Sequence, residues 1–207
     1  MNPRAFVKIC GLSTDADVDT AIAHGADALG FVLTASPRQI SPEQAAALIQ
    51  RIPERVASVA VFRSEPVMEA IELARAAQVG WIQLHGIRTA EEIAAVQQAG
   101  FKAIRAVRMD ASAAQFADLG EDLLLIDAAI PGSGQSWDYA AVRPLAAGRN
   151  WLVAGGLSAD NVAQALELSQ ASGVDVSSGV ESTRGVKDQQ KIIDFLTAAH
   201  RRAQARG

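Results

Sequence analysis

The chain alternates between short runs of strand-forming residues and longer stretches in which hydrophobic positions recur at helical spacing. Strands that alternate with helices in this way indicate a parallel sheet with right-handed crossovers. The short runs predict eight strands, at residues 6–10, 27–33, 56–62, 80–84, 102–107, 122–126, 151–154 and 174–178.

Eight such units fit either a closed (β/α)8 barrel or an open doubly wound sheet. The open sheet would normally carry a G-x-G-x-x-G fingerprint after its first strand, but this chain reads CGLSTD there. We therefore expect an α/β fold in which a single (β/α)8 TIM barrel, with a parallel eight-stranded sheet and outer helices, spans residues 1–207 as one domain.

Several residues mark the ends of the predicted helices. Ser41, followed by Pro42, opens one capping box, Thr89 opens another, and Ser158 can cap the segment that follows it. Glycine is typical just after a helix, and it occurs at three expected helix ends, Gly25, Gly100 and Gly173.

The strand periodicity also predicts which side chains face the barrel interior, because residues two apart in a strand share a face. In the first strand Val7 and Ile9 should point outward, and Lys8 and Cys10 inward. We expect the buried Lys8 to pair with Asp175, because the last strand closes the barrel beside the first and a buried charge needs a partner. The two side chains either only bind each other in the core or also contact a substrate.

Other polar residues are expected on the inner face or among apolar neighbours: Gln83, Arg105, Ser177 and the candidates His85 and Asp127. Cys10, His85 and Asp127 lie nearest the carboxyl ends of their strands, where active sites of these barrels are found. Cys10 is then either a reactive group at the barrel mouth or a small buried hydrophobe, and His85 either packs in the core or lines the pocket.

Three glycine-bearing stretches follow late strands, at residues 131–135, 154–158 and 177–182. Glycine lets backbone N–H groups approach an anion closely, and a following helix adds the positive end of its dipole. The loops after strands seven and eight form a recurrent phosphate site in such barrels. We therefore predict phosphate binding, with the candidate residues Gly134, Gly155, Gly156, Ser178 and Gly179.

Composition narrows the function classes. The net charge of −4 gives no electrostatic footprint for nucleic acid, and no apolar run is long enough to span a membrane. The start of the chain has no apolar secretory segment, and the chain has a single cysteine, so we expect a cytoplasmic protein without disulfides. The histidine and cysteine spacing shows no metal motif.

The motifs VKICGL, GADALGFVL, SPRQIS, QLHG, LLIDA, GSGQSWDY, AGGLSADNV, VDVSSGVES and GVKD occur in this order from residue 7 to residue 188. Together they resemble the phosphoribosylanthranilate isomerase family of tryptophan biosynthesis over nearly the whole chain. The resemblance implies an Amadori rearrangement of a small phosphorylated aminosugar, without cofactor or metal, and leaves the oligomeric state open between monomer and homodimer.

The resemblance further implies that Cys10 is the general base, Asp127 the general acid, and Arg38 the group that holds the anthranilate carboxylate. The glycine loops would hold the phosphate, and we add His85 and Asp175 as candidate substrate contacts. A raised pKa would keep Asp127 protonated, and a modest lowering of the Cys10 pKa, by the helix after CGLS, would supply thiolate.

The chain departs from the family pattern at two positions. Gln135 stands where the family usually has lysine, and Gln39 stands where an aromatic residue commonly follows SPR. Two other functions remain open from the residues: a histidine-pathway aminoaldose isomerase, against which Cys10 argues because that family has aspartate there, and a non-catalytic phosphometabolite-binding module.

Overall fold

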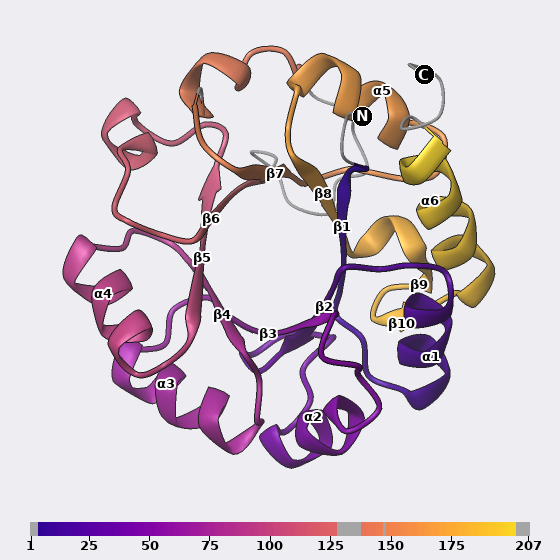
Figure 1. Cartoon of the computed structure of the whole chain (residues 1–207), viewed down its shortest axis with the longest axis horizontal. Helices are drawn as coiled ribbons and strands as arrows, with labels where there is room; N and C mark the ends of the chain where they lie inside the picture. The colour runs from indigo at the N-terminus through magenta and orange to yellow at the C-terminus, as the bar shows by residue number, and fades with distance from the viewer. Residues whose placement is uncertain (1–3, 128–137, 147, 202–207) are drawn as a thin grey trace.

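The structure is a computed structural model that describes residues 4–127, 138–146 and 148–201 of the 207-residue chain. Eight parallel strands close into a barrel in sequence order, and helices surround the ring (Figure 1). The strands are β1 (Phe6–Cys10), β2 (Ala28–Val32), β3 (Ala57–Phe62), β4 (Trp81–His85), β5 (Lys102–Arg108), β6 (Leu123–Asp127), β7 (Trp151–Val153) and β8 (Gly173–Val176). The predicted barrel and its strands are therefore confirmed, with bounds that agree to within two residues.

The outer layer contains α1 (Asp15–Ala23), α2 (Pro42–Ile49), α3 (Val67–Ala76), α4 (Ala90–Gln98), α5 (Val162–Ser169) and α6 (Gln189–Arg201). In the described residues, short 3-10 helices follow β5 and β6 instead of α-helices, namely η1 (Ala113–Phe116) and η2 (Arg143–Ala146). After β8 the chain forms η3 (Ser178–Val180) and a small hairpin, β9 (Glu181–Thr183) with β10 (Val186–Lys187), before α6.

The two predicted capping boxes are present. The Ser41 hydroxyl accepts from the backbone N–H of Gln44, and the Thr89 hydroxyl accepts from that of Glu92. The prediction for Ser158 is wrong, because α5 begins only at Val162 and no side chain caps it. The Ser158 backbone N–H instead donates to the Asn161 side chain, which holds a turn ahead of the helix.

Two of the three glycine helix ends are confirmed. Gly25 and Gly100 have φ angles of +90° and +93°, which favour glycine. Gly173 does not end a helix: it is the first residue of β8, and α5 is followed by Gln170 with a φ of +55°. A Cβ on Gly173 would lie 2.1 Å from the carbonyl oxygen of Phe6, so this glycine lets β8 approach β1 closely.

Alternation along the strands divides the buried side chains into two cores. Val7 and Ile9 belong to the layer between barrel and helices, whereas Cys10 belongs to the barrel interior, as predicted. Arg105, which we expected on the inner face or among apolar neighbours, does not point into the barrel. Its neighbours along the strand, Ile104 and Ala106, fill the interior instead. Its guanidinium therefore lies in the outer layer, where it binds the carboxylate of Glu121 at 2.7 Å.

The pairing register of β1 and β8 places Lys8 directly beside Asp175. The Lys8 Nζ donates to Asp175 Oδ1 at 2.8 Å, so the predicted ion pair is confirmed. Burial favours the neutral amine, but the Asp175 carboxylate and the Cys10 sulfur outweigh it and raise the pKa of Lys8. A full positive charge therefore lies inside the barrel, below the carboxyl ends of the strands.

Candidate active site

A cavity of about 690 Å³ opens at the carboxyl-terminal end of the barrel. Nine of the ten predicted site residues line it, namely Cys10, Arg38, His85, Asp127, Gly155, Gly156, Asp175, Ser178 and Gly179. The tenth, Gly134, lies outside the described residues, as does Gln135. The barrel therefore brings the candidates together, although they are spread over most of the chain; their roles stay predictions.

Cys10 ends β1 and is 7% exposed, on the cavity side of Lys8. Burial raises the pKa of the Cys10 thiol, and the positive charges of Lys8 and Lys187 oppose this effect without overcoming it. The expectation of a lowered pKa is therefore wrong for the protein without substrate. The helix after CGLS does not supply the shift: α1 begins at Asp15, after a cap by Thr14, and carries carboxylates in its first turn.

Asp127 is the last residue of β6, three strands away from β1 around the closed barrel. Its side chain lines the same cavity as the Cys10 thiol, and its backbone carbonyl accepts from the N–H of Met109 at 2.8 Å. A sulfur atom and a carboxyl group therefore reach one cavity from two separate strands.

Arg38 also lines the cavity, but an internal carboxylate already holds its guanidinium. Its Nε and Nη2 atoms donate to the two oxygens of Glu181 at 2.5 Å and 2.9 Å. Burial alone would raise the pKa of Glu181, but the bonds from Arg38 and Lys187 lower it to about 2. Within the described residues, Nη1 of Arg38 has no hydrogen-bond partner, so one edge of the fork stays available to a ligand.

Glu181 and Lys187 are functional candidates that our sequence interpretation missed. They face each other across the β9–β10 hairpin, where Lys187 Nζ donates to Glu181 Oε1 at 2.9 Å and to the Ser177 carbonyl at 2.8 Å. Opposite charges six residues apart around Gly185 were a usable signal for such a hairpin. The contact between Glu181 and Arg38, which are 143 residues apart, had no signal in the sequence.

His85 ends β4 and both lines the cavity and bonds a neighbour on its own strand. The Gln83 side-chain amide lies 2.9 Å from His85 Nε2, and if it donates there, the ring proton is on Nδ1. Burial, with the nearby charges of Lys8, Arg63 and Arg88, lowers the pKa of His85 to about 4. The imidazole is therefore neutral near pH 7 and is available to a substrate as a polar, uncharged group.

The loops after β7 and β8 meet at the remaining side of the cavity. Gly155 and Gly156 have φ angles of +86° and +66°, which glycine adopts without strain. A Cβ on Gly179 would lie 1.8 Å from the carbonyl oxygen of Leu157, so only glycine allows the two loops to touch. Ser178 begins η3 beside this contact. The backbone geometry fits the predicted anion site.

The described residues show neither a metal-ligand cluster nor a membrane-spanning helix. Those residues contain no group of three or more histidine, cysteine, aspartate or glutamate side chains that could hold a metal ion. They also contain no helix with the length and hydropathy needed to cross a membrane.

A closed (β/α)8 barrel whose rim cavity holds a thiol, a carboxyl group, an arginine and two glycine loops defines a TIM-barrel enzyme. Residues 7–198 match the PRAI family, described as N-(5'phosphoribosyl)anthranilate (PRA) isomerase. The chain is 39% identical over 203 residues to the N-(5'-phosphoribosyl)anthranilate isomerase of Zymomonas mobilis, which covers 92% of this chain and 96% of that protein. The chain therefore belongs to the N-(5'-phosphoribosyl)anthranilate isomerase family.

Solved structures agree with this assignment. The phosphoribosyl anthranilate isomerase of Thermus thermophilus is 36% identical, with a TM-score of 0.87 over 97% of this chain and 100% of that chain. A phosphoribosyl anthranilate isomerase in complex with reduced 1-(o-carboxyphenylamino)-1-deoxyribulose 5-phosphate is 31% identical, with a TM-score of 0.83 over 94% of this chain and 98% of that chain.

Proposed function

We propose that this chain converts N-(5'-phosphoribosyl)anthranilate to 1-(2-carboxyphenylamino)-1-deoxyribulose 5-phosphate, an Amadori rearrangement in tryptophan biosynthesis, with Cys10 as base and Asp127 as acid. The observation that carries the proposal is their shared cavity: a thiol from β1 and a carboxyl group from β6 line it together. Proton transfers at separate atoms of one sugar need an acid and a base on different parts of the rim.

The first step opens the furanose ring. Asp127, protonated, donates its proton to the ring oxygen, the bond from that oxygen to C1 breaks, and the nitrogen lone pair forms the C1=N bond of a protonated Schiff base. The carboxylate that remains is the conjugate base. This step requires a raised pKa of Asp127, for which its place at the edge of a cavity provides partial shielding from water.

The second step removes the proton from C2. The Cys10 thiolate takes this proton, the C2–H electron pair forms a C1=C2 bond, and the C=N electron pair moves to nitrogen. The resulting enolamine tautomerises to the ketone as the O2 proton leaves and C1 gains a proton. At the end of the reaction Cys10 has gained one proton and Asp127 has lost one. A net transfer of one proton from Cys10 to Asp127 through solvent therefore restores the starting state of the site.

The two ends of the substrate match the two remaining parts of the cavity. We assign the anthranilate carboxylate to Arg38, whose planar fork suits a carboxylate and keeps Nη1 available. We assign the phosphate to the glycine loops around Gly155, Gly156, Ser178 and Gly179. His85 and Asp175 also line the cavity and are proposed to contact the ribose moiety.

The proposal is tested by following the loss of phosphoribosylanthranilate fluorescence with purified protein. We expect turnover by the parent, and a loss of about 10²–10⁴-fold for Asp127→Asn and for Cys10→Ser, because each removes one proton-transfer group. A product-like ligand should still bind to Asp127→Asn. Absence of turnover in the folded parent would contradict the function, and near-parental turnover of either variant would contradict that residue's role.

Three further properties stay predictions: a monomeric or homodimeric state, a cytoplasmic location, and a single domain over residues 1–207. Light scattering coupled to size-exclusion chromatography measures the first, and cell fractionation the second. For the third, limited proteolysis of the native protein should give no stable fragment of half the length.

A further inference from the structure

Lys8, Asp175 and Cys10 form a continuous column from the barrel interior to the cavity. Lys8 is fully buried, whereas Cys10 and Asp175 are 7% and 8% exposed and line the cavity. A buried ammonium group is costly to keep, and the ion pair with Asp175 satisfies only one of its three N–H donors. A role for the column in structure alone does not explain why the charge is placed next to Cys10.

Gly30 on β2 shows how closely the ammonium and the sulfur approach each other. Gly30 is the Cα partner of Cys10 across the β1–β2 pair. A Cβ on Gly30 would lie 3.0 Å from Cys10 Sγ, 3.1 Å from Lys8 Nζ and 3.2 Å from the Cys10 Cα. Both polar atoms therefore border the same small space, which stays free only because residue 30 has no side chain.

We propose that Lys8 is a positioning residue for the reaction, whose ammonium stabilises the Cys10 thiolate before it takes the substrate proton, while Asp175 holds that ammonium in place and Gly30 leaves room for their approach. The inference rests on the proposed function, in which Cys10 is the base. Lys8 is fully buried and does not line the cavity, so it acts through the sulfur.

The charges that act on Cys10 come from several elements. Burial favours the neutral thiol most strongly, and Lys8 on β1 is the largest charge that opposes it. Asp175 on β8 favours the thiol, and Lys187 on β10 favours the thiolate. Arg38, in the loop after β2, also interacts with the sulfur. Without Lys8, burial and Asp175 would be opposed by the weaker effect of Lys187 and by Arg38.

His85, on β4, is a further titratable group coupled to this column. It is neutral near pH 7 because its pKa is about 4, so it adds no charge that could replace Lys8. A base works best when its pKa lies near the operating pH. Lys8 would bring the buried thiol of Cys10 toward that range.

The test uses the fact that Cys10 is the single cysteine of the chain. Thiolate absorbance near 240 nm, and the pH profile of alkylation by iodoacetamide, therefore report on this residue alone, with Cys10→Ser as the blank. Lys8→Met should raise the thiol pKa and slow alkylation at pH 8 by at least about tenfold, because an opposite charge at this range shifts a pKa by one unit or more.

Asp175→Asn should shift the thiol pKa in the opposite direction. Without the carboxylate, the thiolate becomes the main counter-charge of Lys8, so the pKa should fall below that of the parent protein. A merely structural disturbance would move both variants in the same direction. Equal shifts of the same sign, or an unchanged pKa in Lys8→Met, would overturn the proposal.

Gly30→Ala gives a second test that keeps every charge. Its methyl group must push the ammonium and the sulfur apart, so the thiol pKa should rise by less than in Lys8→Met, with a lower kcat and little change in KM. If Lys8→Met does not fold, Gly30→Ala tests the proposal in its place. An unchanged thiol pKa in Gly30→Ala would then contradict the role of Lys8. The matched control is Glu121→Gln, which alters a buried ion pair outside the barrel and should leave the thiol pKa unchanged.

The titration separates this inference from the proposed function. If the folded parent shows no isomerase turnover, the proposed reaction fails, but the thiol pKa values still decide whether Lys8 stabilises the thiolate. If the parent catalyses the isomerisation and the thiol pKa is the same with and without Lys8, only the inference fails. Comparing pH midpoints, and not absolute alkylation rates, removes the effect of reagent access.

Discussion

Two buried ion pairs in this barrel resemble each other in geometry and differ in surroundings. Lys8 and Asp175 pair at 2.8 Å inside the barrel, and Arg105 and Glu121 pair at 2.7 Å in the outer layer. The outer pair has further protein partners: Arg105 also donates to the carbonyls of Gln115 and Ala117, although its Nε atom has no partner among the described residues.

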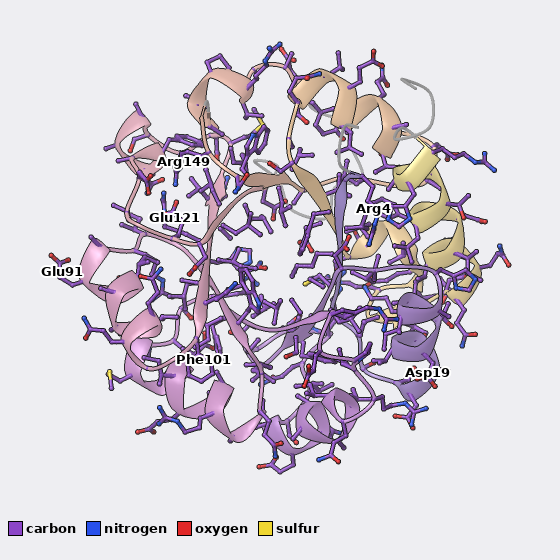
Figure 2. The ribbon with its side chains drawn as sticks, viewed as in Figure 1. Arg4, Asp19, Glu91, Phe101, Glu121 and Arg149 are labelled. Atoms are coloured by element: carbon purple, nitrogen blue, oxygen red, sulfur yellow. The ribbon has the colours of Figure 1, made fainter. Side chains whose placement is uncertain are left out.

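Arg149 completes the outer group by donating to Glu121, and the two side chains lie together outside the ring of strands (Figure 2). The inner pair instead borders a cavity and a sulfur atom. Burial of an ion pair therefore does not identify function; a place beside an open cavity and a thiol is what separates the inner pair from the outer one. The predictions below test this distinction, from the largest expected effect to the smallest.

Cys10→Ser should have the largest effect, because the sulfur is what separates the inner pair from the outer one. We expect kcat/KM to fall by about 10²–10⁴-fold, while the melting temperature changes little, since serine nearly matches cysteine in size. The fluorescence assay and calorimetry measure the two quantities. A similar loss of activity in Arg105→Met would remove the contrast between the pairs.

Arg105→Met should have the second largest effect, on stability alone. It removes a buried charge and leaves the carbonyls of Gln115 and Ala117 without their donor. We expect a loss of about 3 kcal/mol in the free energy of unfolding, or about 10 °C in melting temperature. The activity per folded molecule should equal that of the parent, which denaturant titration together with the fluorescence assay can establish.

The Glu181 carboxylate at the cavity edge should make stability depend on acid pH. The pKa of Glu181 is about 2 in the folded protein, below the ordinary 4.5. The stabilisation that its carboxylate gives to the folded state is therefore present above pH 4.5 and is lost as the pH falls toward 2. The shift corresponds to about 3 kcal/mol at most. Urea unfolding from pH 6 to pH 2.5 should show a shallower decline for Glu181→Gln than for the parent; equal slopes would contradict the assignment.

Lys102→Met should have the smallest effect. The Lys102 ammonium lies 5.0 Å from the ring centre of Trp81, across the β4–β5 pair at the amino-terminal end of the barrel, away from the cavity. Such a contact contributes about 0.5–1 kcal/mol at an exposed site. A small drop in melting temperature with unchanged kinetics is expected, and Lys102→Arg, which keeps the cation, serves as the control.

Much of this site follows from the order of residues. The alternation in FVKIC predicted that Lys8 and Cys10 point inward, and closure of the barrel predicted that Lys8 meets Asp175. The carboxyl ends of β4 and β6 likewise located His85 and Asp127 on the rim. These predictions succeeded because strand periodicity and barrel closure are simple geometric rules that apply wherever the strands are recognised.

Other features depended on contacts that no local pattern contains. Arg38 meets Glu181 because the β9–β10 hairpin folds against the loop after β2: a Cβ on Gly185 would lie only 2.8 Å from the Pro37 carbonyl oxygen. In the sequence Gly173 resembles the glycine at a helix end, but in the structure it allows β8 to approach β1 closely. The outward direction of Arg105 followed from the strand register, which its apolar neighbours alone did not reveal.

The residue order alone established an eight-stranded parallel barrel and the family to which it is similar, because hydrophobic periodicity and short motifs act over a few neighbouring residues. The folded structure settled the electrostatics of the site: the thiol pKa of Cys10 is raised, not lowered, and Arg38 is already bound by a carboxylate. Desolvation and charge pairing depend on groups that are distant in the chain, and these acquire neighbours only when the barrel closes.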